Sequence, residues 1–193
     1  MKKTILITGI LIGIFIFAGL LIKNRDKQSQ STVSSNSVAT ETATPDQKVD
    51  LETGVQKGQL APDFKFTTID GENKKLSDFK GKPVVFGFIL TTGCTPCAEE
   101  ARVLKQVQDK NAINVIQIVV SSIEPKRNIE NFKQYLGGPD WLMTYDNGEE
   151  LTKMYKVRAV DTTIMIDKDG KIIYRDDGYP ARADELEAAL RTT

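Results

Sequence analysis

The chain has 193 residues, and its 26 Lys and Arg balance its 26 Asp and Glu, so the formal net charge is zero. No basic stripe points to nucleic acid, and we expect no nucleic-acid partner. The absence of histidine from the sequence excludes Ser-His-Asp triads, Cys-His nucleophile pairs and most zinc or copper sites. The two cysteines, Cys94 and Cys97, are too few for a stapled secreted scaffold or a structural zinc site. We therefore expect a redox-active pair, no metal and no organic cofactor.

The N-terminal residues resemble a membrane-spanning segment. After two lysines, an apolar run extends from Ile5 to Ile22, interrupted only by Thr8 and glycines. As a helix at about 1.5 Å per residue, this run would be about 27 Å long, close to the ~30 Å of a bilayer's hydrocarbon core. We predict that residues 1–27 are an uncleaved transmembrane signal anchor, and a cleaved signal peptide is the alternative.

Residues 28–58 begin with a polar, low-complexity stretch rich in Ser, Thr and Gln. Such a segment buries too little apolar surface to offset the entropy lost on ordering, so we predict a disordered linker. It would hold the domain, residues 59–193, away from the membrane. Lysines and arginines flank both ends of the apolar run, but long domains translocate largely regardless of flanking charge. We therefore expect a single-pass protein of the cell membrane with its domain on the extracytoplasmic side.

The domain alternates strand and helix signals. The predicted elements are a hairpin around Asp70-Gly71, a buried strand at 83–90, a helix from Thr95, a buried strand at 114–120, a helix from Pro125 to before Gly137, a short helix at 149–155, a hairpin of strands 162–166 and 171–174, and a helix at 183–190. Helical crossovers between buried strands predict an α/β fold whose sheet has a parallel centre and helices on both faces.

Several motifs resemble the redoxin superfamily. They are Ala61-Pro62-Asp63-Phe64, Asp70-Gly71, the run from Leu76 to Pro83, and the segment from Ile164 to Lys171. Within this superfamily, Cys94-Thr95-Pro96-Cys97 resembles the motif of the ResA/TlpA-like branch of membrane-anchored proteins. The resemblance implies a thioredoxin-like fold with a central mixed sheet. It also implies protein substrates with thiols or disulfides, and a membrane partner that donates or accepts electrons.

The predicted chemistry depends on the position of Cys94, where a buried strand should end and a helix should begin. The unpaired N–H groups and partial positive charge of a helix N-terminus favour a thiolate over a thiol. Cys94 is therefore the expected attacking thiolate, and Cys97, one turn later and more buried, is the expected resolving cysteine. Pro96 is tolerated in the first turn because no hydrogen bond is lost there.

Glu100 lies three residues after Cys97, so it can return to the same side of the helix. By resemblance to the ResA-like pattern, a glutamate here is an active-site residue, and a carboxylate near two cysteines can carry protons during exchange. The alternative is a solvated glutamate that complements the helix dipole, which is the role we expect for Glu99.

Two positions depart from the pattern that the resemblance implies. Gly93 stands where the residue before the first cysteine is often tryptophan. Asp161, after Val160, stands where the family has a cis-proline. We predict that Asp161 raises the pKa of Cys94 and makes the pair a weaker oxidant, because a nearby carboxylate repels a thiolate. The alternatives are that Asp161 points to solvent or has no redox role.

The leading functional hypothesis is thiol–disulfide exchange with protein substrates, with the redox direction open. A thiol peroxidase is one alternative, because Thr91 and Cys94 match part of the peroxiredoxin site. Gly87 and Asp161, where that family has a proline and an arginine, count against it. A Cu(I) carrier is another alternative, because thiolates suit Cu(I), although the related metallochaperones also use a histidine.

Overall fold

The computed structural model describes residues 51–192, so the predicted anchor at residues 1–27 and linker residues 28–50 lie outside the described part. Its strands are β1 (Lys65–Thr67), β2 (Asn73–Lys75), β3 (Val84–Ile89), β4 (Asn114–Val119), β5 (Leu142–Tyr145), β6 (Thr162–Ile166) and β7 (Ile172–Asp177). Its helices are α1 (Thr95–Lys110), α2 (Lys126–Leu136), α3 (Glu150–Met154) and α4 (Ala183–Leu190), with 3₁₀ turns at Leu76–Phe79 and Asn147–Glu149. Within residues 51–192, no helix is both long and apolar enough to cross a membrane.

Five strands form the central sheet in the order β5-β4-β3-β6-β7. β3, β4 and β5 run parallel, whereas β6 and β7 pair antiparallel, which confirms the predicted mixed sheet. The hairpin β1-β2 forms a separate two-stranded sheet, and both predicted hairpins are confirmed. β5 was not predicted, because its four residues give too short a pattern to stand out from the adjoining loops.

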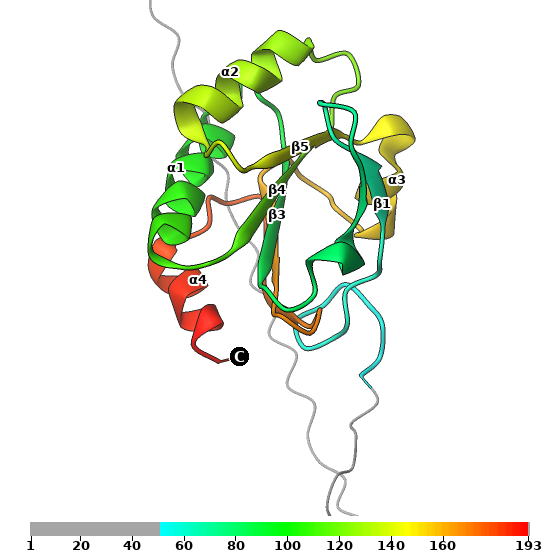
Figure 1. Cartoon of the computed structure of the whole chain (residues 1–193), viewed down its shortest axis with the longest axis vertical. Helices are drawn as coiled ribbons and strands as arrows, with labels where there is room; N and C mark the ends of the chain where they lie inside the picture. Colours follow the sequence, from blue (N-terminus) through cyan, green and yellow to red (C-terminus); the bar gives the residue numbers. More distant parts are fainter. Residues whose placement is uncertain (1–50, 193) are drawn as a thin grey trace, which may run out of the picture. The chain divides into compact units, whose positions relative to one another are not determined.

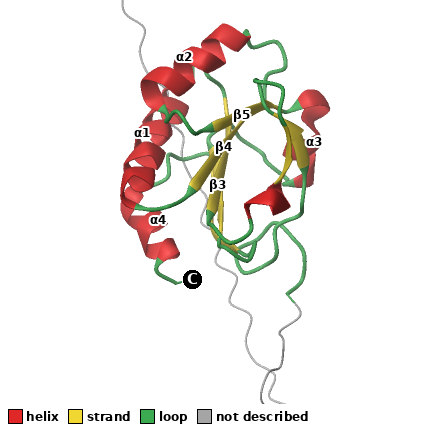
Figure 2. Cartoon of the chain, viewed as in Figure 1, coloured by secondary structure: helices red, strands yellow, loops and turns green. Residues whose placement is uncertain are grey.

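Secondary elements cover the two faces of the central sheet differently (Figures 1 and 2). One face packs against α1, α2 and α4 through side chains such as Leu104, Ile129 and Leu186. The other face packs against the β1-β2 hairpin and α3, where Phe64 and Tyr155 are buried. All six residues of β3 are buried, because this strand lies at the centre of the sheet between both layers. Its end is therefore a rigid position for the residues that follow.

The folded domain begins before the predicted boundary at residue 59. Val55 is buried in the core, Gly54 N–H donates to the Leu60 carbonyl over 2.9 Å, and Gly58 N–H donates to the Ile172 carbonyl over 2.8 Å. The prediction of a linker is therefore wrong for residues 51–58, which pack on the domain. The mostly polar composition of this segment gave no sign that Val55 is buried in the core.

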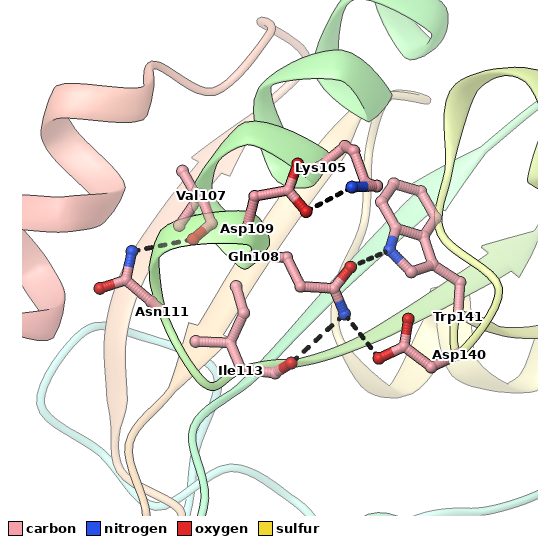
Figure 3. A network of polar contacts seen from close by, with 8 residues as sticks. All are labelled: Lys105, Val107, Gln108, Asp109, Asn111, Ile113, Asp140 and Trp141. Atoms are coloured by element: carbon pink, nitrogen blue, oxygen red, sulfur yellow. Dashed lines mark hydrogen bonds and ion pairs between the residues drawn. The ribbon is translucent and has the colours of Figure 1, made fainter.

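A polar network fixes the C-terminal end of α1 (Figure 3). The Gln108 side chain accepts from Trp141 Nε1 over 2.7 Å and donates to Asp140 Oδ2 over 3.1 Å. Asn111 Nδ2 donates to the Val107 carbonyl over 2.8 Å, which satisfies a carbonyl in the last turn of the helix. The helix that carries both cysteines is thus tied to the segment leading into β5.

Candidate active site

Cys94 lies at the N-cap of α1, five residues beyond the last residue of β3, as the sequence predicted. Its Sγ accepts a hydrogen bond from the backbone N–H of Cys97 over 3.2 Å. The sulfur therefore receives one of the N–H groups that a helix N-terminus leaves unpaired, and such a bond stabilises a thiolate. Cys94 is partly exposed, whereas Cys97 is only 1% exposed.

The two cysteines form a disulfide across the first turn of α1, with their Cα atoms 5.3 Å apart. Pro96 lies in that turn, where its missing N–H costs no hydrogen bond. Gly93 has φ of 71°, a left-handed conformation that a bulky residue adopts only with strain. This backbone accounts for glycine, rather than tryptophan, directly before Cys94.

Glu124 holds the loop that precedes Cys94, a role that was not predicted. Its Oε1 accepts hydrogen bonds from Thr92 Oγ1 over 2.8 Å and from Asn128 Nδ2 over 3.0 Å. Its backbone carbonyl accepts from the Tyr145 hydroxyl over 2.7 Å. The only sequence signal for this role was the position of Glu124 directly before Pro125 and the predicted helix. The contact with Thr92 spans 32 residues, so no local sequence pattern indicates it.

Glu100 is buried in the second turn of α1, with 1% of its surface exposed. The Thr163 hydroxyl donates to its Oε1, and the Ala181 N–H donates to its Oε2 over 3.3 Å. The alternative of a solvated glutamate is therefore wrong for Glu100, whereas Glu99 is exposed as predicted. Thr163 and Ala181 were not predicted as site residues.

Gly87 leaves room for the Gln117 side chain next to Glu100. A Cβ at this position would lie 2.7 Å from Gln117 Oε1 and 3.4 Å from Glu100 Oε1. Gly87 pairs with Gln117 on one side and Thr163 on the other, so the three residues form a row across β4, β3 and β6. A buried polar patch thus lies in the otherwise apolar face beneath α1.

Asp161 lies directly before β6, next to the end of β3. Its φ is 67°, and its N–H donates to the Phe88 carbonyl over 2.7 Å. Proline is unsuited to this conformation, because its ring fixes φ near about −65° and it has no N–H. The Asp161 side chain is 2% exposed, so the alternative that it points to solvent is wrong. Val160, directly before it, is 38% exposed.

The family model named Redoxin matches residues 56–190. The chain belongs to the redoxin family. The thiol-disulfide oxidoreductase ResA of Bacillus thuringiensis subsp. konkukian is 34% identical to it over 143 residues, which cover 72% of this chain and 80% of that protein. The thioredoxin-like protein YneN of Bacillus subtilis is 29% identical over 124 residues, covering 63% and 71%. This redoxin is thus a ResA-like protein with a thioredoxin fold.

Solved structures agree with this fold. A thioredoxin-like protein from Aeropyrum pernix superposes with a TM-score of 0.61 at 26% identity, over 67% of this chain and 89% of that one. A putative thiol:disulfide interchange protein DsbE from Chlorobium tepidum gives a TM-score of 0.60 at 24% identity, over 72% and 98%. The second likeness supports the thioredoxin-like fold alone.

The electrostatics of the redoxin site centre on Glu100 and Asp161. Burial raises the pKa of Glu100 well above its usual value; the nearby Asp161 raises it further, whereas the Thr163 hydroxyl opposes the shift. Burial also raises the pKa of Asp161, and the negative charges of Asp176 and Glu99 add to this effect. Both carboxyl groups therefore resist ionisation.

Proposed function

We propose that the Cys94–Cys97 disulfide is the reacting group through which this chain exchanges disulfides with protein substrates. The chain is a thiol–disulfide oxidoreductase, and this assignment rests on its ResA relatives. The observation that carries the proposal is the asymmetry of the pair. Cys94 is partly exposed at a helix N-cap, and its disulfide partner Cys97 is buried one turn away.

This asymmetry assigns different roles to the two sulfurs. A substrate thiolate can reach Cys94 Sγ, form a mixed disulfide and release the Cys97 thiolate. In the opposite direction, the Cys94 thiolate attacks a substrate disulfide, and Cys97 then attacks Cys94 Sγ and releases the substrate thiolate. The Cys97 N–H and the helix dipole stabilise negative charge on Cys94 in both directions.

Glu100 donates and accepts the protons that Cys97 gains and loses in this cycle. Cys97 gains a proton when the disulfide opens and loses it when the disulfide forms. Glu100 lies three residues further along the same helix, a spacing that brings Cβ atoms to about 5–6 Å. Its raised pKa moves it toward the range in which a carboxyl group can both give and accept protons near neutral pH.

We place the domain on the extracytoplasmic side of the membrane, tethered through Ile5 to Ile22. The apolar run, the polar segment after it and the ResA likeness support this location. The substrates would be proteins with thiols or disulfides, and a membrane partner would donate or accept electrons. Fractionation of cells that express the tagged protein tests its association with the membrane. Protease added outside the cells tests the side on which the domain lies, and we expect the domain to be digested.

Trapping of mixed disulfides tests the assignment of the cysteines. Cys97→Ser should accumulate a covalent adduct with an oxidised, disulfide-bonded model protein, because Cys94 can attack the disulfide and no resolving thiol is present to release the adduct. Cys94→Ser should form no adduct and show no turnover, although Cys97 remains as a matched single cysteine. Equal trapping by both variants would contradict the proposed roles, and peroxide consumption that depends on Cys94 would favour the peroxidase alternative.

The reduction potential decides the direction of exchange. Equilibration with glutathione buffers measures the fraction of Cys94–Cys97 disulfide at each ratio of thiol to disulfide. A value near about −270 mV would indicate a reductant, and one near about −120 mV would indicate an oxidant.

A further inference from the structure

Two acidic side chains meet within the domain, Glu100 from α1 and Asp161 from the segment before β6. They are 1% and 2% exposed, and Asp161 lies close enough to Glu100 to raise its pKa. Within residues 51–192, both Asp161 carboxyl oxygens are buried and have no hydrogen-bond partner. An ionised carboxylate has acceptor oxygens only, so a hydrogen bond between two carboxyl groups requires a proton on one of them.

The donors around the pair are unequally divided. Glu100 accepts from the Thr163 hydroxyl and from the Ala181 N–H, and these bonds only partly offset the burial that raises its pKa. Asp161 must rely on the proton that it shares with Glu100. One proton between the two therefore satisfies both groups, whereas two ionised carboxylates would leave buried like charges in contact.

The charged neighbours act in the same direction. Asp176 on β7 and Glu99 on α1 act on Asp161, and both are acidic. Tyr174 on β7 lies beside Asp176 and Glu185, and burial with these negative charges raises the pKa of its hydroxyl, so it stays neutral. The negative potential of this surface favours retention of the shared proton.

We infer that Glu100 and Asp161 form a carboxyl pair that holds one proton and passes it to Cys97 Sγ when the disulfide opens. This inference rests on the proposed function and deepens it. A substrate thiolate attacks Cys94 Sγ, the bond between Cys94 and Cys97 breaks, and both electrons of that bond stay on Cys97. The pair then protonates the Cys97 thiolate and regains its proton from water. In the reverse reaction the deprotonated pair accepts the Cys97 proton before Cys97 attacks.

Asp161 is what distinguishes this site from one with Glu100 alone. A proline at this position could neither hold a proton nor donate its N–H to the Phe88 carbonyl, as Asp161 does. A single buried glutamate with two donors can ionise without opposing a second charge. With Asp161 beside it, Glu100 shares a proton that the pair retains over a wider pH range. This proton is then available to the Cys97 thiolate when the disulfide opens.

Infrared spectra of the full chain test whether the proton is shared. The carbonyl stretch of a protonated carboxyl group is separate from the carboxylate bands. The oxidised wild-type protein at pH 7 should show one such band, and both Asp161→Asn and Glu100→Gln should lose it, because each new amide donates an N–H to the remaining carboxylate. Absence of the band from the wild type, or its persistence in both variants, would overturn the inference. The wild-type measurement needs no variant to fold and no exchange activity.

The pH profile of disulfide opening tests whether the proton reaches Cys97. The rate at which a small thiol opens the Cys94–Cys97 disulfide is divided by the fraction of that thiol present as thiolate. This corrected rate should fall at high pH, where the Glu100–Asp161 pair loses its proton. In Asp161→Asn the midpoint of this fall should move down by at least one pH unit, a tenfold change in hydroxide concentration. Asp176→Asn, which removes a neighbouring charge and alters the hydrogen bond from Tyr174, should move the midpoint less. Identical profiles for wild type and Asp161→Asn would refute the transfer. Loss of exchange in Cys94→Ser tests the proposed function separately.

Discussion

The two faces of the central sheet bury different kinds of side chain. Toward the β1-β2 hairpin and α3, Phe64, Phe86, Phe88 and Tyr155 pack with ring centroids 5.0–6.4 Å apart. Toward α1, the middle of the sheet carries a polar patch around Glu100 instead. Alternate residues of β3 serve both faces, so one strand links the aromatic cluster to the site.

This difference suggests a division of labour. Tightly packed aromatic rings contribute stability through buried area and edge-to-face contacts. A buried carboxyl pair contributes little to stability and can oppose it, because burial disfavours charge. We therefore expect substitutions on the aromatic face to change the free energy of unfolding, and those beneath α1 to change the redox chemistry.

Phe86→Ala should have the largest effect on stability. Phe86 is fully buried, and its ring lies 5.0 Å from the ring of Tyr155 and 5.7 Å from that of Phe64. Loss of the ring should lower the free energy of unfolding by about 3–5 kcal/mol. Chemical denaturation measures this loss, and the reduction potential of the folded variant should match the wild type. A changed potential would show that the two faces are not independent.

Gly87→Ala, one residue along the same strand, should have a smaller effect on stability and a distinct effect on the site. The new Cβ would lie 2.7 Å from Gln117 Oε1, so side chains beneath α1 must shift. Overpacking of this kind costs about 1–3 kcal/mol. Infrared detection of the protonated carboxyl should change in this variant and not in Phe86→Ala. An unchanged band with lost stability would indicate a purely steric effect.

How far the sequence predicts the molecule also differs between these regions. Except for β5, the strands, the hairpins and the position of Cys94 follow from apolar runs and turn residues, because these signals are local. The surroundings of Glu100 include Gly87, Thr163 and Ala181, which come from separate parts of the chain. These residues come together only in the tertiary structure, so no local sequence pattern predicts their contacts. The effect of Asp161 on Cys94 stays a prediction, whereas its effect on the pKa of Glu100 was not predicted, because the two residues are far apart in the sequence.

The pH dependence of stability follows from the raised pKa of Glu100. A carboxyl group that keeps its proton in the folded state binds more protons there than in the unfolded chain, so stability falls as pH rises. The window opens near the ordinary value of 4.5 and closes at the raised pKa of the folded protein. Within it, the wild type should lose up to about 1.4 kcal/mol per pH unit relative to Glu100→Gln.

Denaturation of both proteins between pH 4 and pH 8 checks this sign. The difference between them isolates the pair, because all other titrating groups are common to both. Stability of the wild type that rises with pH relative to Glu100→Gln would show that Glu100 is stabilised as a carboxylate, against the burial argument.

The smallest effect is expected at the surface of the helical layer. Lys110 Nζ lies 3.0 Å from Glu187 Oε1 and joins α1 to α4, but 56% of the Lys110 side chain is exposed. Such pairs contribute about 0.2–1 kcal/mol and weaken with salt. Lys110→Ala should therefore shift the free energy of unfolding by no more than this at low salt and still less at high salt, with the reduction potential unchanged. A shift in potential would mean that α4 transmits motion to the carboxyl pair through Ala181, which lies two residues before the helix and donates its N–H to Glu100 Oε2.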